Sequence, residues 1–257
     1  MKITTLIENL VYKRGLLAEH GLSIYIESDT RKILFDTGQS DSFLLNANKM
    51  GVKIDEIDLV VISHGHYDHT GGLSSFLRAN TKAKVLMKRE ALSKKYDSHN
   101  NDIGMQCDAK LLENRVEFIT DITEIDCGVF IVPDIPVLNR EDTHFKNFNE
   151  EFLDELYLAI VIDGQLSIIT GCSHRGITNI MKSATDHFNL PLNLVLGGFH
   201  TKSCTDVQFN NIIYFFSNNM PKSIGVCHCT GTEKYSTLKN HFGDKVFYSC
   251  TGSVTEC

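Results

Sequence analysis

The stretch Ser63-His64-Gly65-His66-Tyr67-Asp68-His69-Thr70-Gly71-Gly72 follows an apolar run that predicts a buried strand ending at this point. His64 and His66 are two positions apart, so in extended backbone both side chains point the same way. Asp68 and His69 come after the chain begins to turn and can point at a neighbouring spot. Because imidazole and carboxylate groups ligate zinc, iron or manganese, the spacing predicts two divalent metal ions side by side, one held mainly by each pair.

A purely structural role is the alternative for this stretch. A single histidine is usually a surface or core residue. Three histidines and one carboxylate at a strand end, however, would gather buried polar groups at a high cost in free energy if nothing bound them. The density of the motif therefore favours metal binding.

Length and composition are those of an ordinary globular protein, with 257 residues, of which 42% are hydrophobic and 22% charged. We expect one domain over residues 1–257 with a sizeable core. The net charge of −7 argues against a nucleic-acid partner, which requires a basic face. The first residues do not resemble a secretion signal, and no apolar run reaches membrane-spanning length. We therefore expect no membrane partner, reduced thiols for the eight cysteines and a cytoplasmic location.

Apolar periodicity predicts the order of strands and helices. The predicted strands cover residues 3–7, 22–27, 32–36, 57–62, 84–87, 116–119, 128–132, 156–161, 166–170, 192–196, 223–226 and 245–248. The predicted helices cover residues 41–50, 71–78, 89–95, 175–188, 204–217 and 232–242. Groups of strands followed by helix–strand alternation in each half favour two sheets with helices outside, an αββα sandwich.

Residues 134–154 interrupt this pattern. They are polar and aromatic-bearing and lie close to Pro133 and Pro136, which predicts an insertion over the site rather than a linker between domains. Whether the insertion is a lid or one amphipathic helix packed on the domain stays open at the level of sequence.

Further histidines follow other predicted strands. His174 comes after residues 166–170, His200 after residues 192–196, and His228 after residues 223–226. One four-residue motif cannot saturate two metal ions, so we expect the remaining ligands to come from such strand ends.

The His-x-His-x-Asp-His pattern with its following Gly-Gly resembles the signature of the metallo-β-lactamase superfamily. The resemblance implies the αββα sandwich, with a metal site along one edge. It also implies that Asp36 supports the metal ligands from behind by fixing a histidine ring, although an ordinary turn carboxylate is the alternative. In the superfamily, a Thr-Gly-Asp strand end delivers an aspartate that bridges the metals, and here Cys172 stands at that place. A thiolate still ligates zinc or iron, so the resemblance implies Cys172 or His174 as the ligand.

Two more superfamily positions are matched with alternatives. The superfamily has a histidine upstream of the bridging aspartate, and His144 and His174 are the two candidates for it here. His228 resembles the last superfamily histidine, which binds the second metal. His200 is either a ligand or an acid/base that faces the substrate.

Several segments extend beyond this signature and look like one branch of the superfamily. They are residues 19–23 (Glu-His-Gly-Leu-Ser), 35–40, 63–72, 170–174, 197–200 and 228–231. The branch is labelled 7,8-dihydropterin-6-methyl-4-(β-D-ribofuranosyl)-aminobenzene-5′-phosphate synthase, and its members are also described as metal-dependent hydrolases of the β-lactamase superfamily. The resemblance implies membership, whereas the residues identify no pterin pocket.

The expected function is that of a metal-dependent hydrolase, in which a metal-bound hydroxide attacks a small anionic substrate such as a phosphate ester or a pterin-related compound. Two divalent ions, zinc with manganese or iron as alternatives, would be held by residues from all of these motifs: His64, His66, Asp68, His69, Cys172, His174 and His228. Asp68 would also orient the hydroxide, and His200 would protonate the leaving group.

Three other functions stay open. They are a mononuclear iron oxidoreductase acting on a thiol or persulfide, the dihydropterin synthase activity, and a non-catalytic, metal-dependent ligand sensor. The sequence does not set the oligomeric state.

Overall fold

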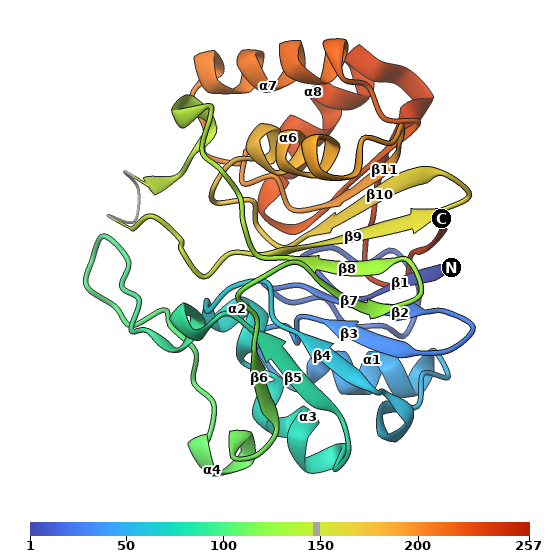
Figure 1. Ribbon diagram of the computed structural model, residues 1–257, viewed down its shortest axis with the longest axis vertical. Helices are drawn as coiled ribbons and strands as arrows, with labels where there is room; N and C mark the ends of the chain where they lie inside the picture. Colours follow the sequence, from blue (N-terminus) through green and yellow to red (C-terminus); the bar gives the residue numbers. More distant parts are fainter. Residues whose placement is uncertain (146–149) are drawn as a thin grey trace. The chain divides into compact units, whose positions relative to one another are not determined.

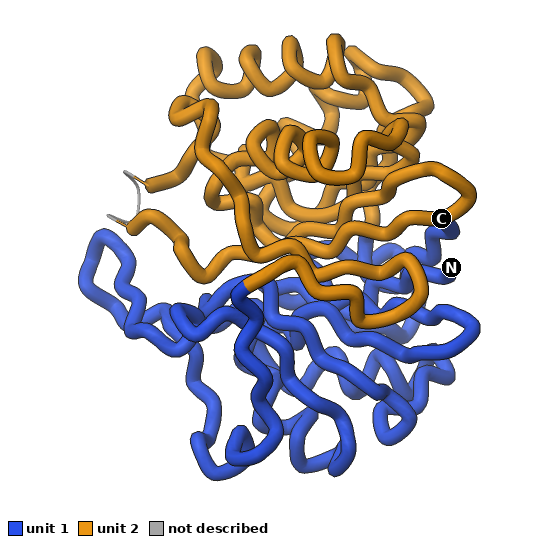
Figure 2. The backbone as a smooth tube through the Cα atoms, in the orientation of Figure 1, with its two compact units in different colours: residues 1–120, 250–257 blue, residues 121–249 orange. Residues whose placement is uncertain are grey.

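The computed structural model describes residues 1–145 and 150–257. Within these residues the chain divides into two compact units, the first made of residues 1–120 and 250–257 and the second of residues 121–249 (Figure 2). Each unit contains one seven-stranded mixed sheet and its own helices. No helix in the described ranges is both long enough and apolar enough to cross a membrane.

The sheet of the first unit has the strand order β14-β1-β2-β3-β4-β5-β6. Figure 1 labels β1 to β6. Its strands, in that order, are Val254–Glu256, Lys2–Ile7, Ser23–Glu27, Lys32–Phe35, Leu59–Val61, Lys84–Met87 and Val116–Phe118. Its helices are α1 (Ser42–Lys49), α2 (Tyr67–Thr70), α3 (Leu73–Ala79) and α4 (Ala109–Leu112), with 3₁₀ turns at Ile54–Glu56 and Arg89–Leu92. One face of the sheet packs against α1 and α3 through a core that includes Phe43, Phe76 and Leu34.

The sheet of the second unit has the strand order β13-β12-β11-β10-β9-β8-β7. Figure 1 labels β7 to β11. Its strands, in that order, are Val246–Tyr248, Ser223–Val226, Leu192–Gly197, Gln165–Thr170, Tyr157–Ile162, Val129–Val132 and Thr123–Asp126. The helices α6 (Ile177–Phe188), α7 (Asp206–Asn218) and α8 (Thr232–Phe242) pack on one face of it, and 3₁₀ turns occur at Arg140–Asp142, His228–Thr230 and Gly243–Lys245. The apolar face of α6, with Ile177, Ile180 and Met181, lies in this core.

The two sheets follow the same plan. In the first, β14, β1, β2 and β3 pair antiparallel, and β3, β4, β5 and β6 pair parallel. In the second, β7 to β10 pair antiparallel, and β10 to β13 pair parallel. Ligands of mixed α/β sheets bind outside the carboxyl ends of parallel strands. In each unit those ends are followed by the histidines and cysteine singled out in the sequence.

Most predicted elements are present with small shifts at their ends, but one predicted helix is wrong and four short elements were not predicted. The predicted helix at 89–95 is only a 3₁₀ turn at Arg89–Leu92. The sequence did not predict α2, α4 and β7, which are each four residues long and carry weak periodicity. It also missed β14, because Val254–Glu256 is short and partly exposed and is fixed by pairing with β1 at the other end of the chain.

The region predicted as an insertion, residues 134–154, contains no strand in its described part and has one 3₁₀ turn. Residues 146–149 of it lie outside the described residues. Several side chains of its described part are buried, among them Asp142, His144 and Phe152. Its predicted place over the site stays a prediction, as does the expectation of a single domain over residues 1–257.

Candidate metal centre

The histidine-rich loop, residues 63–72, begins just beyond β4 and contains α2. His64 and His69 are completely buried, and His66 and Asp68 expose only 5% and 7% of their surface. His64 Nε2 lies 3.1 Å from His66 Nδ1, and the rings of His64 and His69 have centroids 4.3 Å apart. The loop therefore concentrates four groups with metal-ligand chemistry in a small buried volume, as the sequence predicted.

Close backbone packing holds this loop in place. A Cβ atom on Gly65 would lie 2.2 Å from the carbonyl oxygen of Ala91, so no side chain fits there. On the other side of the loop, His66 forms a β-bridge with Gly104, and the Tyr67 amide donates to the Ile103 carbonyl over 2.9 Å. The loop is thus clamped between the 3₁₀ turn after β5 and the segment near residue 104.

Asp36 is the buried anchor of the loop. It follows β3, is 0% exposed and adopts a left-handed backbone with φ of 59°. Its carboxylate accepts hydrogen bonds from the Ser63 amide at 2.7 Å, the Ser63 hydroxyl at 2.6 Å and His69 Nδ1 at 2.6 Å. A carboxylate only accepts, so Nδ1 of His69 carries the ring proton and Nε2 offers its lone pair to a metal.

Burial lowers the pKa of His64 well below its usual value, and the neighbouring imidazoles of His69 and His66 lower it further. Lys95, which is 3% exposed, adds a smaller effect in the same direction. The His64 imidazole is therefore neutral at physiological pH. Neutral imidazole is the form that binds metal ions.

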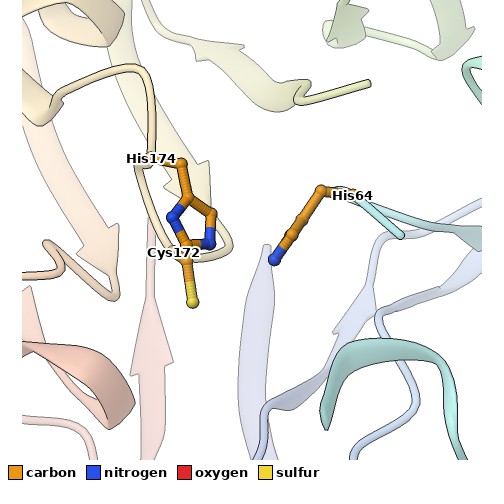
Figure 3. A group of neighbouring side chains, drawn as sticks. All are labelled: His64, Cys172 and His174. Atoms are coloured by element: carbon orange, nitrogen blue, oxygen red, sulfur yellow. The ribbon is translucent and has the colours of Figure 1, made fainter. Parts of the chain in front are cut away.

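The second unit presents Cys172 and His174 on the β10 loop, residues 171–176, which begins where β10 ends (Figure 3). Cys172 is 3% and His174 is 1% exposed. The Cys172 sulfur lies within 4.8 Å of a ring nitrogen of His174 and of a ring nitrogen of His228, which follows β12. Figure 3 also shows His64 of the first unit at the start of the histidine-rich loop.

Glu155 holds the β10 loop from its backbone side. This carboxylate is completely buried and accepts hydrogen bonds from the amides of His174 and Arg175, each at 2.7 Å. Burial raises its pKa to about 7, although the two amide donors act in the opposite direction. Glu155 is not recognisable from the sequence, because an acidic residue just before a strand carries no distinctive signal.

Two further histidines of the second unit, His144 and His200, lie beside His174 of the β10 loop. The ring centroid of His200 lies 4.2 Å from that of His144 and 4.5 Å from that of His174. The His144 amide donates to the His174 carbonyl over 2.9 Å, and Phe152 stacks on the His174 ring with centroids 4.0 Å apart. Burial lowers the pKa of His144 to about 4, so this ring is also neutral.

A model of the metallo-beta-lactamase superfamily matches residues 17–171, which include the histidine-rich loop and Asp36. The chain belongs to the metallo-beta-lactamase superfamily. It is 32% identical to an uncharacterized protein of Methanocaldococcus jannaschii, over 93% of this chain and 95% of that protein. It is 26% identical to the 7,8-dihydropterin-6-methyl-4-(beta-D-ribofuranosyl)-aminobenzene-5′-phosphate synthase of the same organism, over 94% of this chain and 92% of that protein.

A solved relative gives the same assignment. The crystal structure of a protein described as a metal-dependent hydrolase of the beta-lactamase superfamily has a TM-score of 0.87 and 33% identity to this chain. The match covers 100% of this chain and 99% of the relative. The predicted superfamily and its αββα fold class are therefore confirmed.

The residues of this superfamily member fit a divalent metal ion. Imidazole, thiolate and carboxylate are the donors that such ions take in proteins, and the donors of each unit are buried. Asp36 holds the His69 ring in the first unit, and Glu155 holds the backbone of His174 in the second. In the first unit the structure gathers His64, His66, Asp68, His69 and Asp36, and in the second it gathers Cys172 with His174 and His228. The ligand role of each residue stays a prediction.

The sequence left open which of His144, His174 and His200 completes the metal site. The three side chains lie close together, so each of them is near the β10 loop. His200 is half-buried and has a left-handed backbone with φ of 50°.

Proposed function

We propose that this protein is a hydrolase that depends on two divalent metal ions and acts on a small anionic substrate, such as a phosphate ester, in the cytoplasm. The observation that carries the proposal is the buried histidine-rich loop, in which Asp36 accepts a hydrogen bond from His69 Nδ1 and leaves Nε2 as the nitrogen that would bind a metal. Membership of a superfamily with a solved relative described as a metal-dependent hydrolase supports it. When bound, the metal ions would lower the pKa of a coordinated water and supply the nucleophile near neutral pH.

The proposed ligands are the buried donors of the strand-end loops, namely His64, His66, Asp68, His69, Cys172, His174 and His228. We propose zinc as the metal because this set mixes imidazole, thiolate and carboxylate donors. Manganese and iron are the alternatives, and a measurement of the metal content distinguishes them from zinc. The neutral state of the His64 imidazole supports a ligand role, because no proton has to leave before binding.

Two side chains have proposed roles in the reaction itself. Asp68 would orient the attacking hydroxide toward the substrate. His200, which is half-buried, would protonate the leaving group. The buried Lys95 adds a positive charge near the histidine-rich loop, which supports an anionic substrate.

A second candidate is the synthase activity named for one relative. The observation in its favour is 26% identity to the dihydropterin ribofuranosyl-aminobenzene phosphate synthase over 94% of this chain. That named product also carries a phosphate, so both candidates share an anionic ligand. Detection of this product by mass spectrometry, in a reaction mixture that the named synthase converts, would favour the second candidate.

The first test is the metal content of protein purified without added metal or chelator, measured together with hydrolysis of a panel of phosphate esters. We expect about two zinc ions per chain and metal-dependent turnover. His66→Ala should lose metal and turnover, whereas His241→Ala, at an exposed histidine of α8, should behave like the wild type. Retained metal and activity in His66→Ala would contradict the assignment, and a single iron would favour the oxidoreductase.

A further inference from the structure

One motif singled out in the sequence has no role in the proposed reaction. It is the segment Glu19-His20-Gly21-Leu22, which connects β1 to β2 in the first unit. This segment lies directly against the histidine-rich loop. The Leu22 amide donates to the Asp68 carbonyl over 3.1 Å, and a Cβ atom on Gly21 would lie 2.5 Å from that same oxygen. Only glycine therefore lets the segment pass so close to Asp68.

Glu19 fastens the other end of the segment. Its carboxylate accepts hydrogen bonds from the amides of Gln39 and Ser40, at 3.2 and 3.1 Å, and from the Ser40 hydroxyl at 2.5 Å. The Glu19 amide in turn donates to the Glu8 carbonyl over 3.2 Å. The segment is thus fixed on both sides of His20, and the position of this imidazole is set by the surrounding backbone.

The fixed imidazole reaches the side chain of Asp68. His20 Nε2 lies 3.2 Å from Asp68 Oδ2. The side chain of Asp68 is 9% exposed, whereas that of His20 is 52% exposed, so one edge of the pair faces solvent. A hydrogen bond with this much exposure contributes little to stability. Its consequence lies in geometry, because it occupies one oxygen of a proposed metal ligand.

Asn9 sets the tautomer of His20. The Asn9 Oδ1 accepts a hydrogen bond from the Gly21 amide at 3.3 Å, which fixes the orientation of the side-chain amide. Asn9 Nδ2 therefore faces His20 Nδ1 at 3.2 Å and donates to it. Because Nδ1 accepts, the ring proton is on Nε2, where it points at Asp68.

We infer that His20 is a positioning residue for Asp68. It donates Nε2–H to Oδ2 and so holds the Asp68 carboxylate beside the histidine-rich loop, where Oδ2 also lies 3.8 Å from His69 Nε2. The arrangement mirrors that of Asp36 and His69, in which a carboxylate orients a ligating imidazole, whereas here an imidazole orients a ligating carboxylate. The inference rests on the proposed metal-binding function. Partners that orient metal ligands typically contribute about 10- to 100-fold to metal affinity or activity.

The test compares His20→Ala and His20→Gln with the wild type by titration with Zn²⁺ alone against a chromophoric chelator. We expect Zn²⁺ affinity to fall by about 10- to 100-fold in His20→Ala. His20→Gln should restore most of it, because the glutamine Nε2 can donate from nearly the same place. His241→Ala serves as the control for removal of an exposed histidine. Circular dichroism of the metal-free proteins should show the same fold for all variants.

Each other outcome overturns the inference. Unchanged Zn²⁺ affinity in His20→Ala means that Asp68 needs no support, and the proposed function survives. Equal loss in His20→Ala and His20→Gln means that the imidazole itself is required, as for a direct ligand. A wild-type protein that binds no Zn²⁺ overturns the proposed function together with the inference.

Discussion

Replacement of Asp36 by asparagine should weaken metal binding without removing a side chain from the core. The Ser63 amide can only donate, so the asparagine must keep its oxygen at the Oδ1 position, where that amide is 2.7 Å away. Its NH₂ group then takes the place of Oδ2 and faces His69 Nδ1, which lies 2.6 Å from that atom in the wild type. Two donors cannot face each other, so the His69 proton moves to Nε2.

The magnitude follows from this tautomer change. A metal on Nε2 requires the proton on Nδ1, so binding forces the two N–H groups of the variant against each other. The metal complex then lacks one charge-assisted hydrogen bond, which contributes about 1.5–3 kcal/mol. At about 1.4 kcal/mol for each tenfold change, Zn²⁺ affinity should fall by about 10- to 100-fold.

Competition with a chromophoric chelator measures this affinity, and Ser63→Ala is the matched control. That control removes the Ser63 hydroxyl, which lies 2.6 Å from Oδ2 and 2.9 Å from His64 Nδ1, but leaves His69 and its tautomer unchanged. A loss of Zn²⁺ affinity in Asp36→Asn that is no larger than in Ser63→Ala would refute the tautomer argument. Equal far-UV circular dichroism of the metal-free proteins would exclude misfolding as the cause.

Three other perturbations have defined outcomes. Gly65→Ala should lower the free energy of unfolding by about 1–3 kcal/mol in urea titrations, because the new Cβ would lie 2.2 Å from a backbone oxygen. Gly15→Ala is the control: its Cβ would have no atom within 4 Å, so only the strain of its left-handed φ should lower the stability. Burial raises the pKa of Asp142 from 3.8 to about 7. The stability that the protonated carboxyl group contributes is therefore fully present below pH 3.8 and is lost as pH rises through 7. Wild-type stability should therefore fall by up to about 4 kcal/mol relative to Asp142→Asn between pH 4 and about 8, and parallel pH curves would contradict this. Zn²⁺ at about 100 times its dissociation constant should raise the free energy of unfolding by about 2.7 kcal/mol, and a chelator should reverse the gain.

The parts of the fold that the sequence predicted well are those with strong local signals. The Asp163-Gly164 turn between β9 and β10 has positive φ at both residues, which is what a two-residue hairpin needs. The apolar face of α6 and the buried run before the histidine-rich loop are of the same kind. Strand β14 escaped prediction because its pairing with β1 joins opposite ends of the chain, and such a contact leaves no periodicity in a short segment.

The candidate site shows the same division. His64, His66, Asp68 and His69 were predictable because four donors fall within one short stretch. Glu155 was not, because its function depends on accepting two backbone amides of a loop that lies 19 and 20 residues away in sequence. His20 stood in a recognisable segment, but only the structure shows its ring nitrogen 3.2 Å from Asp68. Candidate metal ligands can be predicted from their residue types, whereas the residues that hold those ligands in place are found only from tertiary contacts.

The candidate loops of both units share one backbone feature. Four residues other than glycine that adopt left-handed backbone follow strands in these loops, at Asp36, Ser173, His200 and His228, with φ between 50° and 59°. Such a conformation costs a residue with a Cβ about 1–2 kcal/mol. Strain of this kind is often kept where a side chain must be presented at a functional site.

The cost at His200 can be isolated by comparing two variants that both lack the imidazole. His200→Gly and His200→Ala lose the same ring contacts with His144 and His174, and they differ only by a Cβ on a backbone with φ of 50°. We expect the glycine variant to unfold with a free energy about 1 kcal/mol higher in urea, because relief of the left-handed strain exceeds the extra entropy of glycine in the unfolded chain. Both variants should lose turnover if His200 protonates the leaving group. An alanine variant as stable as the glycine variant would show that the loop relaxes to another φ, and that the wild-type conformation is not held against strain.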